Sequence, residues 1–109
     1  MISYEDFTKI ELRVGRVIRA EEFPEARKPA YKLWIDFGEY GVKKSSAQIT
    51  GLYSIEDLVN RMVVAVVNFP VKRIAGFSSE VLVLGAVGDR EEVVILGVDR
   101  DVEPGTRVL

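Results

Sequence analysis

The sequence contains no cysteine and no histidine among its 109 residues. The missing cysteine excludes disulfides, thiolate metal ligation and a cysteine nucleophile. The missing histidine removes the commonest general base and the commonest transition-metal ligand. No carboxylate, lysine, tyrosine or serine stands in a recognisable pair with a base and an orienting group. We therefore predict a protein that is not an enzyme, has no catalytic residue and requires no cofactor.

A metal site is also disfavoured by what one acidic segment lacks. Asp99, Asp101 and Glu103 alternate in the manner of an oxygen-ligand loop. The glycine and the terminal bidentate glutamate of a calcium-binding loop are missing. We interpret this segment as an acidic turn and predict no bound metal.

Long hydrophobic runs are missing as well. No apolar segment approaches the roughly 20 residues that a membrane-spanning helix needs. The segment from Met1 to Asp6 lacks the basic and apolar stretches of a secretion signal. We therefore expect a cytoplasmic protein that does not insert into a membrane.

The composition that is present suits one folded domain, with 48% hydrophobic and 29% charged residues. We expect residues 1–109 to form a single domain. The net charge of -2 and a pI near 5.2 argue against a globally basic nucleic-acid binder. Basic side chains nevertheless concentrate between Lys9 and Lys44, whereas acids dominate from Glu80 to Glu103. A local basic face is therefore compatible with the composition.

The first half of the chain predicts a short helix followed by three strands. Ser3 with an acid three residues later is a helix start. Residues 11–23 alternate as a long strand, with Leu12, Val14, Ile18 and Ala20 on one face and Arg13, Val17 and Arg19 on the other. Gly15 interrupts this strand and indicates a bulge or bend. After a proline-rich loop, residues 31–37 and the unusually polar residues 42–49 form two further strands around a turn at residues 38–41.

The second half of the chain predicts a short central helix and more strands. Ser54 marks the start of that helix, and residues 62–67 and 81–87 are valine-rich runs typical of strands buried on both faces. A partner subunit is one source of the second cover. Residues 93–98 form a last strong strand, and Pro104-Gly105 turns the chain into a short final segment.

This element order favours an all-β OB-fold, a five-stranded barrel with short helices and terminal extensions. An immunoglobulin-like sandwich is disfavoured because it needs more evenly spaced strands and no central helix.

The segment at residues 67–81 is the candidate binding loop, because it joins the two most apolar strands. Lys72 and Arg73 have the charge to pair with phosphates, and Gly76 lets a ligand backbone approach closely. Ser79 and Glu80 have groups that hydrogen-bond base edges. On the pattern alone, a plain connecting loop with solvated charges explains the segment equally well.

Two motifs resemble the tRNA-binding domain family, whose members include domains appended to methionyl- and phenylalanyl-tRNA synthetases. Residues 7–17 (FTKIELRVGRV) are similar to the family's opening, and residues 67–81 (VNFPVKRIAGFSSEV) to its second signature. Residues 20–27, 45–49, 73–77 and 79–85 resemble the CsaA-type branch, described as secretion-related chaperones. The resemblance covers nearly the whole chain. It implies an OB-fold homodimer, with the N-terminal helix and terminal segments at the interface, that binds RNA or unfolded peptides.

The resemblance also assigns candidate RNA-binding positions, namely Asn68, Lys72, Arg73, Gly76, Ser79 and Glu80. Val81 departs from the pattern, since tRNA-binding members have glycine followed by methionine there. A β-branched residue restricts the backbone where glycine allows close approach of a nucleotide. The CsaA-type branch shares this change, which is consistent with a different ligand.

Other candidate positions lie outside the signature. Lys44, Lys43 and Arg13 extend a basic face, although charged side chains on exposed strands are usually only solvated. Trp34 faces away from the inferred core, where it can stack on a base or receive an apolar peptide side chain; a loop or partner subunit covering it is the favoured alternative. Trp34 and Phe77 are the predicted peptide-binding residues.

We therefore predict a non-catalytic protein of the CsaA type that binds tRNA or structured RNA and also acts as a chaperone in protein export. The alternative is a secretion chaperone that binds unfolded preprotein peptides and has no physiological RNA ligand.

Overall fold

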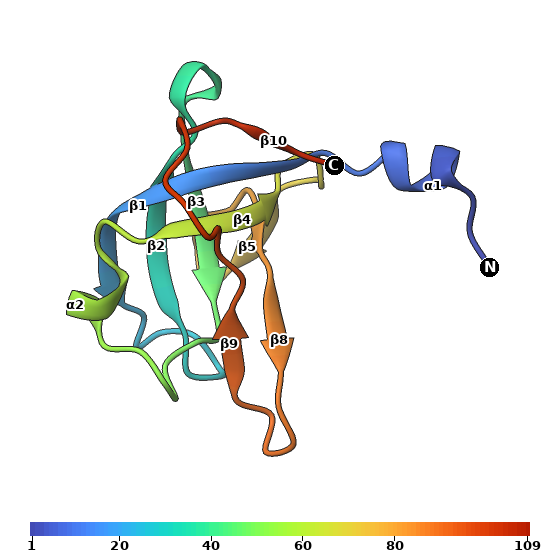
Figure 1. Ribbon diagram of the computed structural model, residues 1–109. Helices are drawn as coiled ribbons and strands as arrows, with labels where there is room; N and C mark the ends of the chain where they lie inside the picture. The colour runs from blue at the N-terminus through green and yellow to red at the C-terminus, as the bar shows by residue number, and fades with distance from the viewer.

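Alternating apolar residues join neighbouring strands into one strongly curved antiparallel sheet, in the order β3-β2-β1-β4-β7 (Figure 1). The computed structural model describes residues 1–109. The strands of this sheet are β1 (Leu12–Glu22), β2 (Tyr31–Asp36), β3 (Val42–Ala47), β4 (Met62–Val66) and β7 (Leu82–Val83). The short strand β10 (Arg107–Val108) pairs with the start of β1. The predicted all-β OB-fold, a five-stranded barrel with short helices, is confirmed.

Two hairpins and three short helical segments complete the fold. The hairpins pair β5 (Lys72–Ile74) with β6 (Phe77–Ser79), and β8 (Gly85–Val87) with β9 (Val93–Ile95). The helical segments are α1 (Tyr4–Thr8), α2 (Ile55–Leu58) and the 3-10 turn η1 (Gly38–Tyr40). Neither α-helix is long enough to cross a membrane.

The core lies inside the barrel and follows the predicted alternation of β2. Tyr31, Leu33, Ile35 and Phe37 are all buried in it. All five residues of β4 are buried as well, with Val63 and Ala65 in the main core and Met62 and Val64 in a smaller cluster with Val14. The prediction that this strand is covered on both faces is therefore confirmed.

The predicted face assignment of β1 is wrong, because the bulge lies further along the strand than Gly15. The pairing of β1 with β2 shifts register between Val17 and Arg19. Such a shift moves the following side chains to the opposite face. Val17, which precedes the shift, is fully buried in the main core, and Ile18 at the shift is exposed. Ala20 beyond the shift packs against the same core as Val17, although the prediction placed these two residues on opposite faces.

Gly15 serves close packing instead of a bulge. A Cβ atom at this position would lie 2.5 Å from Ile35 Cγ2 and 2.7 Å from Phe37 Cε1. Any side chain larger than hydrogen would therefore displace two core residues of the neighbouring segment.

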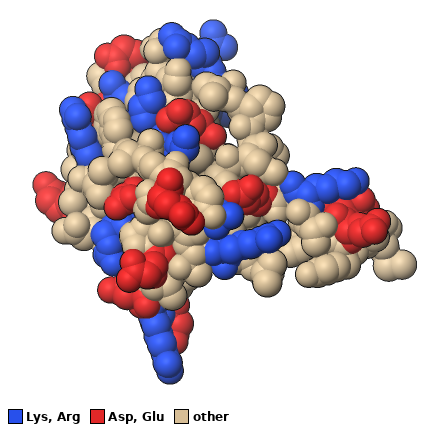
Figure 2. Space-filling model, turned by 90° about the horizontal axis from the view of Figure 1, so that it is seen from above, with Lys and Arg blue, Asp and Glu red and all other residues tan.

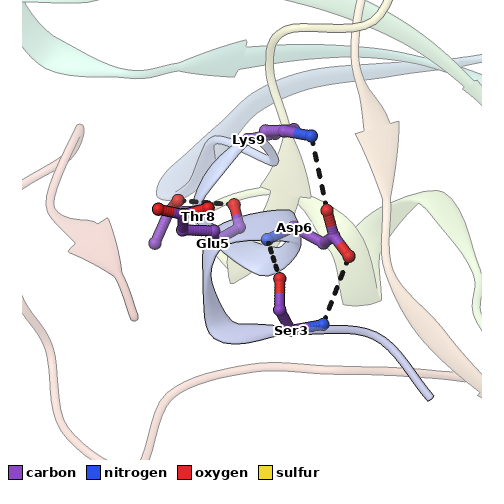
Figure 3. Close-up of polar contacts among 5 residues, drawn as sticks. All are labelled: Ser3, Glu5, Asp6, Thr8 and Lys9. Carbon is purple, nitrogen blue, oxygen red and sulfur yellow. Dashed lines mark hydrogen bonds and ion pairs between the residues drawn. The ribbon is translucent and has the colours of Figure 1, made fainter.

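Both helices begin as predicted, with capping boxes at Ser3 and Ser54. In α1, Ser3 Oγ accepts from Asp6 N–H at 3.1 Å and Ser3 N–H donates to the Asp6 carboxylate at 3.2 Å (Figure 3). The hydrogen bond from Ser3 N–H, followed by that from Lys9, lowers the pKa of Asp6. The helices differ in packing: α2 buries Leu58 in the core, whereas α1 buries no residue and extends away from the barrel (Figure 1).

Two predicted segments differ from the structure. Residues 67–81 are not a plain loop, because β5 and β6 form a hairpin whose turn residues Ala75 and Gly76 have φ of 47° and 82°. Positive φ at both central positions is the geometry of a tight hairpin turn. Residues 81–87 are not one doubly buried strand, because the chain leaves β4 after β7 and pairs with β9 instead. Leu82 and Val87 are therefore exposed, by 47% and 71%.

Candidate nucleic-acid interface

The closure of the barrel between β3 and β7 depends on two side chains of the family motif. Ser79 Oγ accepts from Ser46 N–H at 3.0 Å, and Glu80 Oε1 accepts from Lys44 N–H at 2.9 Å. Lys44 C=O in turn accepts from the N–H groups of Glu80 and Val81, at 2.8 Å and 3.3 Å. Ser79 and Glu80 thus replace ladder hydrogen bonds across the gap, a structural role that the sequence did not indicate.

Asn68 also has both ends of its carboxamide engaged within the chain. Its Oδ1 accepts from Glu11 N–H at 2.9 Å, and its Nδ2 donates to Lys9 C=O at 2.8 Å. These two bonds fix the segment between α1 and β1 against the end of β4. The RNA-binding role of Asn68, Ser79 and Glu80 stays a prediction. To contact RNA, each side chain would have to use an oxygen lone pair that is still free or break a hydrogen bond described above.

The guanidinium of Arg13 is held by three contacts within the chain, and its side chain is only 15% exposed. It pairs with Glu11 at 2.7 Å, donates to Gly105 C=O at 2.8 Å and lies 3.9 Å from the centre of the Tyr40 ring. The hydrogen bond to Glu11 raises the pKa of Arg13. These contacts connect β1 to the Pro104-Gly105 turn, so Arg13 has a structural role in addition to its predicted one.

The β5–β6 hairpin presents the two adjacent cations of the motif to solvent. Lys72 and Arg73 are both exposed, and Arg73 Nη1 donates to Ser78 Oγ at 2.9 Å. Gly76 occupies the turn, and an added Cβ there would meet nothing within 4 Å. The glycine is therefore required by its positive φ, and the space above the turn is open to a ligand.

A cluster of aromatic rings and cations covers the outer face of β1, β2 and β3 beneath this hairpin. Phe77 of β6 meets Trp34 of β2 edge to face, with ring centres 5.8 Å apart, and meets Phe23 in the same way at 5.5 Å. The structure thus brings together Trp34 and Phe77, which the sequence singled out separately.

Three cations lie on these rings. The Arg19 guanidinium is 4.5 Å from the centre of the Trp34 ring and also pairs with Glu21. Lys32 Nζ lies 5.1 Å from the Phe23 ring, and Lys44 Nζ lies 5.2 Å from the Phe77 ring. We call this set of six residues the outer patch: Arg19, Phe23, Lys32, Trp34, Lys44 and Phe77.

Three members of the outer patch were not among the predicted site residues: Arg19, Phe23 and Lys32. Strand alternation places Lys32 and Trp34 on the same face, so Lys32 was accessible to sequence reasoning. Arg19 was not, because it pairs with Trp34 only as a result of the register shift in β1. Over the face seen in Figure 2, basic and acidic side chains are interspersed, so this face carries no continuous basic surface.

A small barrel with cations and aromatic rings on its outer strands is typical of OB-fold binding domains. The family model for a putative tRNA binding domain matches residues 12–107, and the chain belongs to that family. Within it, the chain is similar to two solved chaperones. The crystal structure of chaperone CsaA from Bacillus anthracis str. Ames has a TM-score of 0.95 and 55% identity, covering 100% of this chain and 99% of that one. The CsaA chaperone protein from Picrophilus torridus has a TM-score of 0.94 and 52% identity, covering both chains fully, at 100% and 100%.

The family also includes parts of much longer enzymes. The methionine–tRNA ligase of Methanocaldococcus jannaschii is 37% identical over 107 residues, which is 98% of this chain and 16% of the ligase. The chain thus spans about one sixth of the length of that relative. The match lies in one domain of the ligase, and the family itself is a tRNA-binding class and not a catalytic one.

Proposed function

We propose that the protein binds tRNA or structured RNA without catalysing a reaction, and that the outer patch holds the RNA. The observation that carries this proposal is the arrangement of three cations on aromatic rings, of which Trp34 and Phe77 are half-buried and meet each other while Phe23 is buried behind Phe77. Aromatic and guanidinium planes stack on unpaired bases, and the ammonium groups neutralise phosphates.

The β5–β6 hairpin supplies the second part of the proposed interface. Lys72 and Arg73 are exposed on the same hairpin that carries Phe77 of the outer patch, where they can follow the phosphate backbone beyond a stacked base. Membership of the tRNA-binding family supports the RNA ligand independently of this geometry.

The test is titration of the protein with fluorescently labelled tRNA by anisotropy at several salt concentrations. We expect the double variant Lys72→Ala/Arg73→Ala to weaken binding about tenfold or more and to lower the salt slope by about 1 to 2. The matched control is Arg100→Ala, which removes another exposed cation whose side chain is 90% accessible and pairs only with Asp99. Equal affinities of the double variant and the wild type would disprove a phosphate-binding role for this hairpin.

Trp34 gives a direct test of stacking, because it is the only tryptophan. A base that stacks on the outer patch should quench its fluorescence, and Trp34→Phe should retain more affinity than Trp34→Ala. Binding of tRNA with no change in Trp34 emission would place the RNA elsewhere.

We propose further that the protein acts as a chaperone in protein export. The support is the 55% identity to a CsaA chaperone over the whole chain, together with apolar rings at the surface of the outer patch. Trp34 and Phe77 are the proposed contacts for apolar side chains of an unfolded preprotein. If RNA and peptide share the outer patch they compete, so tRNA should reduce the protection of an unfolded client against aggregation.

The alternative is a peptide-binding secretion chaperone with no physiological RNA ligand. Recovering RNA and peptides with the protein from its native cell separates the two proposals. Peptides without RNA would favour the alternative, and tRNA at stoichiometric yield would favour the RNA-binding proposal. Both proposals place the protein in the cytoplasm, where tRNA and unexported preproteins are found.

We propose that the protein is a homodimer, because the segments on either side of the β5–β6 hairpin expose apolar side chains around a hollow. Residues 69–72 and 79–82 line this hollow of about 410 Å³, in which Phe69, Val71 and Leu82 are about half exposed. The nearby helix α1 buries nothing on its own barrel and exposes Tyr4 by 72%. A second copy could cover both surfaces at once.

Light scattering coupled to gel filtration tests the dimer. We expect twice the 12.2 kDa protomer mass for the wild type and the single protomer mass for Val71→Asp. Val42→Asp is the matched control, since Val42 is exposed to a similar extent, 49% against 56%, and does not line the hollow. A wild-type protein that elutes as one protomer at micromolar concentration would contradict the proposal.

A further inference from the structure

The barrel has an open seam next to its closure between β3 and β7. The last backbone hydrogen bonds across it are those from Glu80 and Val81 N–H to Lys44 C=O. Beyond this point β3 continues through Ala47 while residues 82–87 turn toward β4 and β9, and the two segments do not pair. Figure 1 shows the β8–β9 hairpin running down beyond the end of β3.

The open edge of β8 follows from the alternation of an antiparallel pair. Leu84 and Leu96, and Gly88 and Glu92, are bonded pairs, since Leu96 N–H donates to Leu84 C=O and Gly88 N–H to Glu92 C=O. Gly85 and Ile95, and Val87 and Val93, are therefore non-bonded pairs. The N–H and C=O groups of Gly85 and Val87 point away from β9, and those of Ile95 and Val93 point away from β8. On β9 the outward N–H of Ile95 is satisfied by the Tyr53 hydroxyl at 3.0 Å. The outward groups of Gly85 and Val87 instead face the seam.

A groove of about 380 Å³ lies along the seam, between the open edge of β8 and the end of β3, where the Ser46 N–H is already bonded to Ser79 Oγ. Gly85 and Val87 line one side of it, and Ser46 and Gln48 at the end of β3 line the other. Its floor and walls are mostly apolar, made by Ala47, Ile49, Ile74, Leu82, Val83, Leu84, Val87 and Val93. An unpaired backbone edge above an apolar floor is a feature that accepts an added strand.

We propose that this seam binds an extended polypeptide segment of another protein as an added β-strand. The charges at the two ends of the groove define the segment further. Lys72 is the only charged residue that lines the groove. The tip of the β8–β9 hairpin beyond Val87 is net negative, because it carries the exposed carboxylates of Asp89 and Glu91 beside the single exposed guanidinium of Arg90. The complementary segment is apolar on alternate residues, with an acidic residue at the Lys72 end and a lysine at the hairpin tip. This site adds to the outer patch and does not depend on RNA binding.

The experiment uses a fluorescein-labelled peptide of sequence Glu-Val-Thr-Val-Thr-Val-Lys and the full-length protein. We expect the protein to bind this peptide and to bind a version N-methylated at alternate residues at least tenfold more weakly, because N-methyl groups remove the donors of an added strand. Exchange of the terminal Glu and Lys should also weaken binding. Absence of binding to the parent peptide, or equal affinity for its N-methylated version, would overturn the proposal.

A substitution on the protein side isolates the same hydrogen bonds. Val87→Pro removes the outward N–H without removing a hairpin hydrogen bond, whereas Val87→Ala shortens the side chain and keeps that N–H. We expect peptide affinity to fall about tenfold in Val87→Pro and less than threefold in Val87→Ala, with tRNA affinity unchanged in both. Equal peptide binding by Val87→Pro and wild type would place the strand elsewhere.

The proposed chaperone function and the proposed strand-binding seam can be tested separately. If Val87→Pro protects an unfolded client as well as wild type does, the chaperone function stands and the seam is not its binding site. A second overturning result is that a single-stranded RNA oligonucleotide, and not the peptide, shifts the backbone amide resonances of Gly85 and Val87. Peptide-induced shifts confined to these amides and Gln48 would support the seam.

Discussion

The side chain of Glu80 provides the sharpest test of whether the family motif serves the fold or the ligand. Replacing it by alanine removes the acceptor of Lys44 N–H, a contact of 2.9 Å, and leaves the backbone bond from Glu80 N–H to Lys44 C=O in place. Hydrogen bonds to charged acceptors contribute about 1.5–3 kcal/mol, and the half-buried position of Glu80 favours the lower end of that range. We therefore expect Glu80→Ala to lower the free energy of unfolding by about 1.5 kcal/mol, or Tm by about 6 °C for a chain of this size.

Urea unfolding followed by Trp34 fluorescence measures this effect, because the single tryptophan lies on β2, next to β3. Glu80→Gln keeps a neutral acceptor and should lose less than about half as much stability, and Ser79→Ala should lose about 1 kcal/mol. The affinity for tRNA should stay within about twofold of wild type in Glu80→Gln, since a carboxylate does not attract phosphates. An unchanged unfolding midpoint in Glu80→Ala, combined with lost tRNA binding, would refute the closure role and make Glu80 a ligand contact.

Three further predictions concern the core. Gly15→Ala should cost about 1–3 kcal/mol in urea unfolding, because the new methyl group would overlap Ile35. Ser45→Ala should raise stability by about 1 kcal/mol in thermal unfolding, since the buried Ser45 hydroxyl has no hydrogen-bond partner. Burial raises the pKa of Tyr31, so its contribution to stability is complete below pH about 10 and is lost as the pH rises through the folded pKa. Absorbance titration should show one late tyrosine, absent in Tyr31→Phe.

The sequence predicted those parts of the fold that depend on residues close together in the chain. The capping boxes at Ser3 and Ser54 and the strict alternation of β2 were predicted correctly, because both depend on residues a few positions apart. The faces of β1 were not, because its bulge is set by pairing with β2. Gly15 was a misleading signal, since a glycine in a strand serves a bulge and a close approach equally well.

The candidate site could be predicted only in part, because it is formed by residues that are far apart in the chain. Trp34 and Phe77 were each singled out as candidate peptide contacts, but their mutual contact joins strands that are far apart in sequence. The motif residues Ser79 and Glu80 carry groups that suit either a base edge or a backbone N–H. Only the position of β3 shows that backbone N–H groups already occupy these acceptors.

The two hydrogen bonds of the Asn68 carboxamide have a consequence for any mutational study of binding. They join the end of β4 to the segment that leads into α1, so they set the direction in which the helix leaves the barrel. Asn68→Ala would release this arm, and a protein whose assembly depends on the arm would then lose ligand affinity at a distance. A loss of RNA binding in that variant would therefore resemble the removal of a base contact, even if Asn68 never touches RNA. Measuring subunit mass beside affinity separates an assembly defect from a true recognition defect.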